Sequence, residues 1–508
     1  MASVDSDAVA EQVNEKQGNV FVSEDRKTSV SGDARADALQ LWGRYRLRPL
    51  SASVKFLLCL LIAFATAWWA QNQAGLAPAP ARMLFIMVLA ALLWVLEAIP
   101  AYSVGILVIA LQILLLGNPD RDIFAQEPGD WENFVVVLGH PLIWLFFGGF
   151  VLSAAVRKTG LDLSLAGRLI QWFGKTPSSL LFGVMGGSMV FSMFMSNTAT
   201  TTMMLAIIAP VIVGLGSSNP FAKALLLGVP FAANLGGMVT IIGSPPNAIA
   251  AGALANVPGQ EINFLTWMLF GLPPAVILFA VTWVFLRARY PNTAKRFVAA
   301  ELQVATVDES VRTQPPWQRR LVISTLLVTV GLWMSGQWTG IPTTVVSFLP
   351  ITLLTASGIL REQDVRQIPW DILLLLAGGL ALGNGVRDTG LADWLVAGLP
   401  LEGLGQYGVV FVLCYATVIL SNLMSNTAAA NILVPIAVVL ASGFEDLAVV
   451  SLALCASCAM VLPISTPPNA IAYGTGQLES SDFLIGGLLV GLIAPIVIVG
   501  WSALVIGW

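Results

Sequence analysis

Long apolar runs recur along this chain and restrict it to very few folds. Most of them have close to the roughly 20 residues that an α-helix needs to cross a bilayer. Only 11% of the 508 residues are charged, whereas ordinary soluble domains have about 25%. The alternating segments of a membrane β-barrel do not occur. The sequence therefore predicts an all-α polytopic membrane protein, with apolar runs at about 55–72, 81–98, 101–117, 139–158, 177–214, 221–256, 264–286, 320–337, 340–358, 369–388, 407–442, 446–476 and 484–505.

The run 177–214 decides the predicted topology, because it has roughly twice the length of one span. Three polar residues at 196–198 interrupt its centre, so it is either two spans or a re-entrant hairpin whose tip stops inside the membrane. Basic residues favour the cytoplasmic side, and the polar N-terminal tail ends in a basic stretch. An even number of crossings puts the basic loop 287–319 on that side and the mostly acidic loop 119–133 on the other. The polar centre favours the hairpin.

The two halves of the chain repeat each other. The stretch "FFGGFVLSAAVRKTGL" (146–161) aligns with "LAGGLALGNGVRDTGL" (376–391), and "IIGSPPNAIAAG" (241–252) aligns with "LPISTPPNAIAYG" (462–474). Each half is predicted to hold three spans, a hairpin, a broken span and a final span. Because five crossings are an odd number, the second half is inverted relative to the first, as in many secondary transporters. The predicted organisation has about 11 transmembrane helices, the N-terminus cytoplasmic and the C-terminus outside, and comprises a disordered cytoplasmic tail (1–50), a first transmembrane helix (51–80), a first inverted repeat (81–286), a basic cytoplasmic loop (287–319) and a second inverted repeat (320–508).

The tetrapeptide Ser-Asn-Thr-Ala stands at the centre of both predicted hairpins, at 196–199 and 425–428. A helix broken inside the membrane leaves unpaired carbonyl and N–H groups, which are tolerated where they bind something. Carbonyl ends suit a cation, and N–H ends with their positive dipole suit an anion. A Pro-Pro pair breaks a second helix in each half, at 245–246 and 467–468. Such groups also serve helix packing, but their paired recurrence predicts a binding site, and Asn431, outside the motif, is predicted to tolerate substitution.

The paired Ser-Asn-Thr motifs, each followed by "GSPPNAI" or "STPPNAI", resemble those of the divalent anion/sodium symporter family, whose members carry dicarboxylates, citrate or sulfate. The resemblance covers about 55–505 and implies a homodimer in which each protomer has a scaffold domain and a transport domain that moves like an elevator. It implies one sodium site at Ser192, Ser196, Asn197 and Gly243, and another at Ser421, Ser425, Asn426 and Ser465, where an alanine is expected at the last position. It implies that the substrate carboxylates contact Asn197, Thr198, Ser244, Ser425, Asn426, Thr427 and Thr466.

Enzyme and redox interpretations find little support in the sequence. A Walker P-loop for ATP-driven pumping does not occur, and His140 is the only histidine. Helix packing explains the pair Cys455 and Cys458 better than metal or redox chemistry does. Glu97 is the main acidic residue within a predicted span, where it is either a proton relay or an anchor near the span's end. We expect no enzyme activity, no organic cofactor and no nucleic-acid partner.

The leading hypothesis is sodium-coupled import of a C4-dicarboxylate such as succinate across a bacterial inner membrane. The partners are then a small dianion, sodium ions and the lipid bilayer. Neither tip carries Lys or Arg, so bound sodium and helix N-termini have to neutralise the dianion. Dicarboxylate exchange, sulfate or citrate transport by the same fold, and an anion channel are the alternatives. Uptake driven by a sodium gradient alone separates symport from exchange, and turnover far above about 10³ per second indicates a channel.

Overall fold

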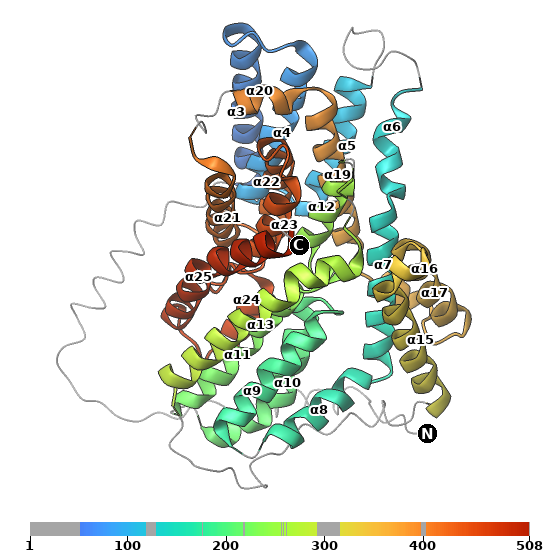
Figure 1. Ribbon diagram of the computed structural model, residues 1–508, viewed down its shortest axis with the longest axis vertical. Coiled ribbons are helices and arrows are strands. Elements are labelled where there is room, and N and C mark those ends of the chain that lie inside the picture. The colour runs from blue at the N-terminus through green and yellow to red at the C-terminus, as the bar shows by residue number, and fades with distance from the viewer. Residues whose placement is uncertain are drawn as a thin grey trace, which may run out of the picture. The chain divides into compact units, whose positions relative to one another are not determined.

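The computed structural model describes residues 51–117, 129–174, 176–216, 219–255, 257, 259–260, 262–291, 315–397 and 403–506. The predicted tail 1–50 and most of the two charged loops lie outside the described residues. Every regular element that is described is a helix (Figure 1). The first half contains α3 (Ala52–Gln73), α4 (Pro78–Leu96), α5 (Ala101–Leu116), α6 (Glu132–Val135), η2 (Val136–Gly139), α7 (Pro141–Lys158), α8 (Leu161–Phe173), α9 (Pro177–Ser192), α10 (Asn197–Leu215), α11 (Pro220–Gly237), η3 (Ile241–Gly243), α12 (Pro245–Ala255) and α13 (Phe264–Arg289). The second half contains α15 (Pro316–Met334), α16 (Gly336–Thr339), α17 (Thr343–Ala356), α18 (Glu362–Arg366), α19 (Trp370–Asp388), α20 (Leu391–Ala397), α21 (Gly405–Leu423), α22 (Asn426–Leu440), α23 (Glu445–Ala456), α24 (Pro467–Tyr473) and α25 (Ser480–Ile506).

Among the described residues, 7 helical segments are long and apolar enough to cross a membrane: α3, α4, the run from α6 to α7, α10, α13, α21 and α25. The helices α5, α9, α17 and α22 are also apolar but shorter. These segments confirm an all-α polytopic membrane protein. The number of spans stays a prediction, because α5 and α17 are shorter than the roughly 20 residues of a span. The hairpin stays a prediction as well, since α10 alone is long enough to cross.

Proline and short polar residues set the starts of many helices. A proline occupies the first turn of α4, α7, α9, α11, α15 and α24, where its missing N–H has no partner to lose. The Thr176 side chain accepts a hydrogen bond from Ser179 N at 3.2 Å and so caps α9. Glu97 lies exposed just after α4, with a left-handed φ of 47° and its N–H bonded to the carbonyl of Leu93. The structure thus places Glu97 at the end of its helix and not within the span.

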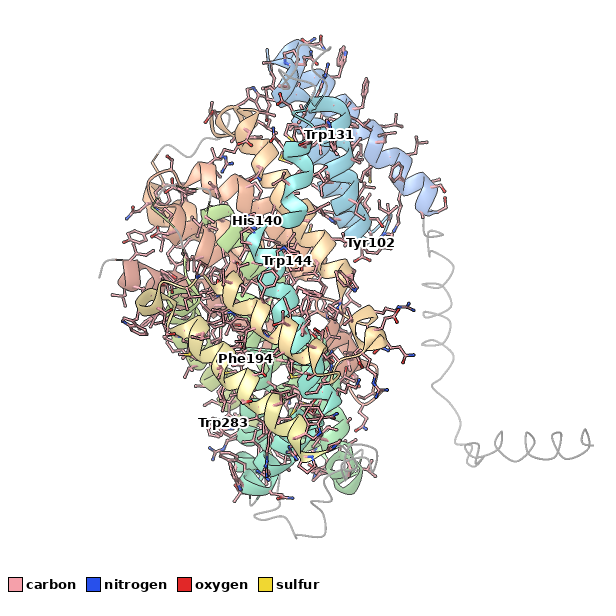
Figure 2. All side chains as sticks on the ribbon, turned by 90° about the vertical axis from the view of Figure 1, so that its right-hand side faces the viewer. Tyr102, Trp131, His140, Trp144, Phe194 and Trp283 are labelled. Atoms are coloured by element: carbon pink, nitrogen blue, oxygen red, sulfur yellow. The ribbon has the colours of Figure 1, made fainter. Side chains whose placement is uncertain are left out.

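The single histidine caps a helix, and the four cysteines are buried. His140 precedes α7 and accepts a hydrogen bond on Nδ1 from Leu142 N at 3.3 Å. It lies between Trp131 and Trp144 along this segment (Figure 2). All four cysteines are buried and unbridged. The described part of the chain contains no group of three or more His, Cys, Asp or Glu residues that could hold a metal ion.

Equivalent helices of the two halves pack in a reciprocal pattern. Helix α5 of the first half packs on α19 of the second, and α7 packs on α17. Helices α9 and α10, before and after the first Ser-Asn-Thr motif, pack on α11. Helices α21 and α22, before and after the second motif, pack on α23. Across the halves, α10 contacts α24 and α22 contacts α12. In Figure 1 the pair α9 and α10 and the pair α21 and α22 lie on opposite sides of α24. The helix that begins at each Ser-Asn-Thr motif therefore contacts the helix that begins at the Pro-Pro pair of the other half.

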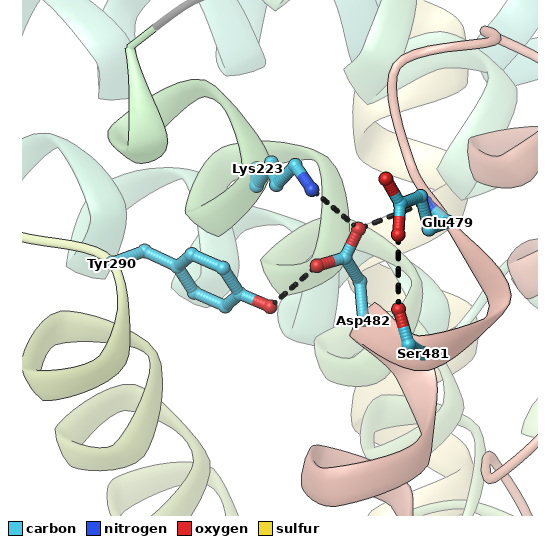
Figure 3. Close-up of polar contacts among 5 residues, drawn as sticks. All are labelled: Lys223, Tyr290, Glu479, Ser481 and Asp482. Carbon is cyan, nitrogen blue, oxygen red and sulfur yellow. Dashed lines mark hydrogen bonds and ion pairs between the residues drawn. The ribbon is translucent and has the colours of Figure 1, made fainter. Parts of the chain in front are cut away.

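A polar cluster around Asp482, in the first turn of α25, joins the two halves (Figure 3). The Lys223 ammonium of α11 lies 2.8 Å from Asp482 Oδ2. The Tyr290 hydroxyl, just after α13, donates to Asp482 Oδ1 at 3.0 Å, and the Glu479 backbone N–H donates to Oδ2 at 2.8 Å. Two of these three donors, Lys223 and Tyr290, thus fasten the start of α25 to the first half.

Replacing Asp482 with asparagine is expected to lower the free energy of unfolding by about 1–3 kcal/mol. The substitution preserves the shape of the side chain but leaves Lys223 without its counter-charge. The thermal unfolding midpoint of the purified protein in detergent measures the effect. Glu479→Gln is the matched control, because Glu479 is exposed and reaches Asp482 only through its backbone, and we expect it to stay within about 0.5 kcal/mol of the wild type. Equal midpoints for Asp482→Asn and the wild type would contradict the fastening role.

Candidate functional site

One pocket of about 180 Å³ collects both Ser-Asn-Thr tips and both Pro-Pro breaks. Seven lining residues are those for which the resemblance implies substrate contacts: Asn197, Thr198, Ser244, Ser425, Asn426, Thr427 and Thr466. Six predicted sodium ligands also line the pocket, namely Ser196, Asn197, Gly243, Ser425, Asn426 and Ser465. The remaining two, Ser192 and Ser421, are fully buried near the ends of α9 and α21. Residues from segments about 230 positions apart in the sequence therefore meet in one small volume.

The two tips have the same local geometry. The Ser196 side chain caps α10 by accepting a hydrogen bond from Ala199 N at 3.2 Å, and the Ser425 side chain caps α22 in the same way from Ala428 N at 3.2 Å. Serine is a preferred residue at this position because its oxygen satisfies one free N–H of the first turn. The N-terminal ends of α10 and α22 thus both lie at the pocket wall. The partial positive charge of each end favours an anion between them.

Buried oxygen atoms stand next to each tip. In the first half, Ser192 Oγ donates to Asn197 Oδ1 at 2.6 Å. Gly237 lies against the same amide, since a Cβ added there would be 2.4 Å from Asn197 Oδ1. In the second half, Ser421 Oγ and Asn426 Oδ1 are both buried and have no hydrogen-bond partner among the described residues. Because a buried polar atom normally has a partner, these neutral oxygens suit a hard cation such as sodium.

An asparagine after each Pro-Pro pair holds the helix break open. Asn247 Nδ2 donates to the carbonyls of Gly237 at 2.8 Å and Thr240 at 2.7 Å. Asn469 Nδ2 donates to two backbone carbonyls of the second break, at 3.2 and 3.1 Å. Both asparagines are fully buried. The sequence assigned them no role, although their recurrence after both Pro-Pro pairs was a usable signal.

Several other residues that line the pocket were not predicted from the sequence. Phe146 and Phe150 of α7, with ring centroids 5.8 Å apart, and Ile372 of α19 supply apolar surface. Asn234 of α11 supplies a fully buried amide. Phe146 and Phe150 lie within the repeated stretch 146–161, and Asn234 is a polar residue in an otherwise apolar run. None of these signals indicates the pocket without knowledge of the tertiary contacts.

The described pocket lining contains no Lys, Arg, His, Asp or Glu. An anion in this pocket therefore meets only hydroxyl and amide groups, two helix N-termini and a small apolar surface. These groups do not fully neutralise a doubly charged ligand, because each helix end carries only about half an elementary charge. Cations bound beside the anion would complete the neutralisation. The arrangement suits joint binding of a dianion and small cations more than it suits catalysis.

Comparison with known proteins agrees with this chemistry. The sequence profile described as "Sodium:sulfate symporter transmembrane region" matches residues 51–508. A protein of Staphylococcus saprophyticus named sodium-dependent dicarboxylate transporter SdcS is 30% identical over 438 residues, covering 80% of this chain and 82% of its own. The SdcS protein of Staphylococcus aureus is 30% identical over 439 residues with the same coverage.

Two solved structures share the fold at low sequence identity. The YdaH transporter of Alcanivorax borkumensis superposes with a TM-score of 0.53 at 13% identity, over 80% of this chain and 99% of that one. MtrF of Neisseria gonorrhoeae, from a class of antimetabolite efflux pumps, superposes with a TM-score of 0.52 at 11% identity, over 87% of this chain and 97% of that one. With the profile match across residues 51–508 and the relatives at 30% identity, the chain belongs to the sodium:sulfate symporter family, which is the divalent anion/sodium symporter family that its paired motifs resemble.

Proposed function

We propose that this protein is a secondary active transporter that couples sodium ions to the import of a C4-dicarboxylate such as succinate. The observation that carries the proposal is the uncharged pocket built from two Ser-Asn-Thr tips and two broken helices. The names of the relatives, sodium-dependent dicarboxylate transporters, support both the ion and the substrate class. The apolar side chains of Phe146, Phe150 and Ile372 suit the methylene groups between two carboxylates.

Sodium and substrate are proposed to bind in a fixed order. In the first site, Ser192, Ser196, Asn197 and the Gly243 carbonyl hold one sodium ion, and in the second site the ligands are Ser421, Ser425, Asn426 and Ser465. The dianion then lies between the two N-termini, on the seven pocket residues for which the resemblance implies substrate contacts. Because those groups alone leave the dianion under-neutralised, substrate binds weakly until sodium has bound. This dependence couples the two fluxes without any titratable side chain among the described residues that line the pocket.

Transport is proposed to proceed by alternating access between two inverted halves. The reciprocal contacts of α5 with α19 and of α7 with α17 support a pseudo-twofold relation. We further propose a homodimer with an elevator-like transport domain, located in a bacterial inner membrane with the N-terminus cytoplasmic and the C-terminus outside. In this arrangement the hairpins enter from opposite faces and their tips meet near the midplane.

Reconstitution into proteoliposomes tests the proposal. An inward sodium gradient is expected to drive uptake of radiolabelled succinate into empty vesicles, and unlabelled succinate to compete better than citrate, 2-oxoglutarate or sulfate. Uptake only into vesicles preloaded with dicarboxylate would identify an exchanger. A flux far above about 10³ molecules per second for each protein would identify a channel.

Sulfate is the second candidate substrate, because the description of the matching family profile names sodium and sulfate. Sulfate is also a dianion and also needs cations beside it in an uncharged pocket. It lacks the methylene chain that the apolar side chains of the pocket would contact. Stronger competition by sulfate than by succinate in the same assay would favour this candidate.

Single cysteines at Thr198 and Thr427 test the depth of the tips. We expect both cysteines to react slowly with a bulky impermeant thiol reagent and to be protected by sodium plus substrate, because both line the pocket. The four native cysteines are buried, which keeps the background low. A cysteine at the exposed Thr339, the last residue of α16, is the matched control and should react fast in every condition. Fast labelling of either tip in all conditions means that its segment spans the membrane twice.

A further inference from the structure

Asn234 connects the two halves of the chain inside the pocket. Its side chain comes from α11, is fully buried and lines the pocket. Its Nδ2 donates to Thr466 Oγ1 of the second half at 3.1 Å. Its Oδ1 is buried and has no hydrogen-bond partner among the described residues. The Nδ2 side of this amide is therefore fixed by the protein, and Oδ1 is left as a buried acceptor without a donor among the described residues.

The contact also fixes the direction of the Thr466 hydroxyl. Thr466 Oγ1 accepts from Asn234 Nδ2 and from Asn469 N, the latter at 3.3 Å as the cap of α24. A hydroxyl oxygen has two lone pairs and one proton. Since both lone pairs face N–H groups, the Thr466 proton is left to donate to a substrate carboxylate.

The contact between Asn234 and Thr466 has no counterpart at the equivalent positions of the opposite halves. The two Pro-Pro-Asn motifs align with Asn247 on Asn469, and the same offset places Ser244 on Thr466 and Ala456 on Asn234. Alanine has no group that could orient the Ser244 hydroxyl. One end of the pocket thus holds a fixed donor with a free acceptor beside it, and the other end does not. Two such ends distinguish the two halves of a bound dicarboxylate.

We propose that Asn234 is a specificity-determining residue that selects dicarboxylates with a hydroxyl on the carbon next to the carboxylate held by Thr466. The inference rests on the proposed function of the pocket. A carboxylate offers no proton to Asn234 Oδ1, so an unsubstituted substrate leaves this acceptor without a donor. A hydroxyl on the adjacent carbon supplies that donor. Malate fits this description and succinate does not.

The test compares malate with succinate in sodium-driven uptake by the full-length protein. We expect the wild type to favour malate in kcat/KM by about tenfold, the typical effect of giving one buried acceptor its donor. Asn234→Ala is expected to bring the ratio close to one. It also raises KM for both substrates, because the Thr466 hydroxyl loses its orientation. The change in the malate-to-succinate ratio measures the contribution of Asn234 Oδ1. The rise in KM that both substrates share measures the contribution of the oriented Thr466 hydroxyl.

Asn422→Ala is the matched control. Asn422 is also a buried asparagine, but its Nδ2 and Oδ1 bond to Val418 O and Val461 N within the second half, at 2.8 Å each. We expect this variant to lose stability and to keep the wild-type ratio of malate to succinate. A ratio that Asn234→Ala leaves unchanged overturns the inference.

The wild type alone provides a second check that does not depend on how well any variant folds. A wild type that takes succinate as well as malate, or better, also overturns the inference and leaves the proposed function intact. A wild type that transports neither substrate with sodium removes the proposed function itself. The two failures are therefore distinguishable.

Discussion

Replacing Asn197 with aspartate is expected to weaken dicarboxylate binding by nearly a thousandfold. Asn197 lines the pocket at the start of α10, and aspartate adds a negative charge beside the anion. Like charges about 4 Å apart repel by about 4 kcal/mol at an effective dielectric constant of about 20, and about 1.4 kcal/mol corresponds to tenfold in affinity. Ser192 and Gly237 hold this side chain in place, so it has little room to turn away. Succinate binding to the purified protein, measured by calorimetry at saturating sodium, gives the ratio directly.

Two further variants check that charge causes this effect. Asn197→Ser should be milder, because it shortens the oxygen without adding charge. Asn72→Asp places the same charge on the exposed surface of α3 and should leave binding unchanged. Wild-type affinity and sodium dependence in Asn197→Asp would falsify the shared cation and anion site at this tip.

Asn431 is not the tolerant position that the sequence suggested. It is fully buried, and both of its amide atoms are without a partner among the described residues. A Cβ built on Gly379 of α19 would lie 1.8 Å from Asn431 Oδ1. The prediction of tolerance is wrong because it rested on distance from the motif along the chain, whereas burial depends on which helix faces α22. A substitution at Asn431 therefore changes the packing of α22 on α19 and is unsuitable as a control.

The second large effect is expected from replacing Asn247 with leucine. The substitution preserves the approximate volume but removes the N–H groups that bond to Gly237 O and Thr240 O. The Thr240 carbonyl keeps a hydrogen bond from Gly243 N at 3.1 Å, so the Gly237 carbonyl is the one left without a donor. A buried carbonyl without a donor costs about 1–3 kcal/mol, so the free energy of unfolding should fall by about that amount. Since Gly237 also lies against Asn197, sodium and substrate affinity should fall as well. Thermal unfolding in detergent, with and without sodium and succinate, measures both effects.

The second half supplies a replicate of this experiment. Asn469→Leu removes the equivalent pair of hydrogen bonds and should cost a similar amount. Asn72→Leu, on the exposed face of α3, controls for the chemical change and should stay within about 0.5 kcal/mol of the wild type. An unfolding midpoint of Asn247→Leu equal to that of the wild type would mean that the helix break holds its shape without the asparagine.

The sequence predicted the local features of this fold well, because each depends on neighbouring residues. Apolar runs predicted the helices, and the Ser-Asn-Thr motifs and Pro-Pro pairs predicted breaks, at which α10, α12 and α24 begin. The internal repeat then suggested that both tips face a common site, and their residues do line one pocket. Whether those residues bind sodium and substrate stays a prediction for the experiments above.

What the sequence could not provide depends on contacts between distant segments. The bond from Asn234 to Thr466 joins positions 232 residues apart, and no periodicity within α11 indicates it. Phe146 and Ile372 line the pocket because α7 and α19 of different halves face it. The number of membrane spans also depends on tertiary structure, since helices as short as α17 lie below the usual span length while α10 reaches it.

The absence of charged side chains from the described pocket lining has an electrical consequence for the proposed cycle. When such a pocket changes sides, the charge that moves is that of its cargo alone, and the empty pocket returns without moving charge. Two sodium ions with one dianion make the loaded step electrically silent. A third sodium ion would move one net positive charge, which a membrane potential of 100 mV drives with about 2.3 kcal/mol. The current that accompanies uptake therefore counts the sodium ions carried with each dianion.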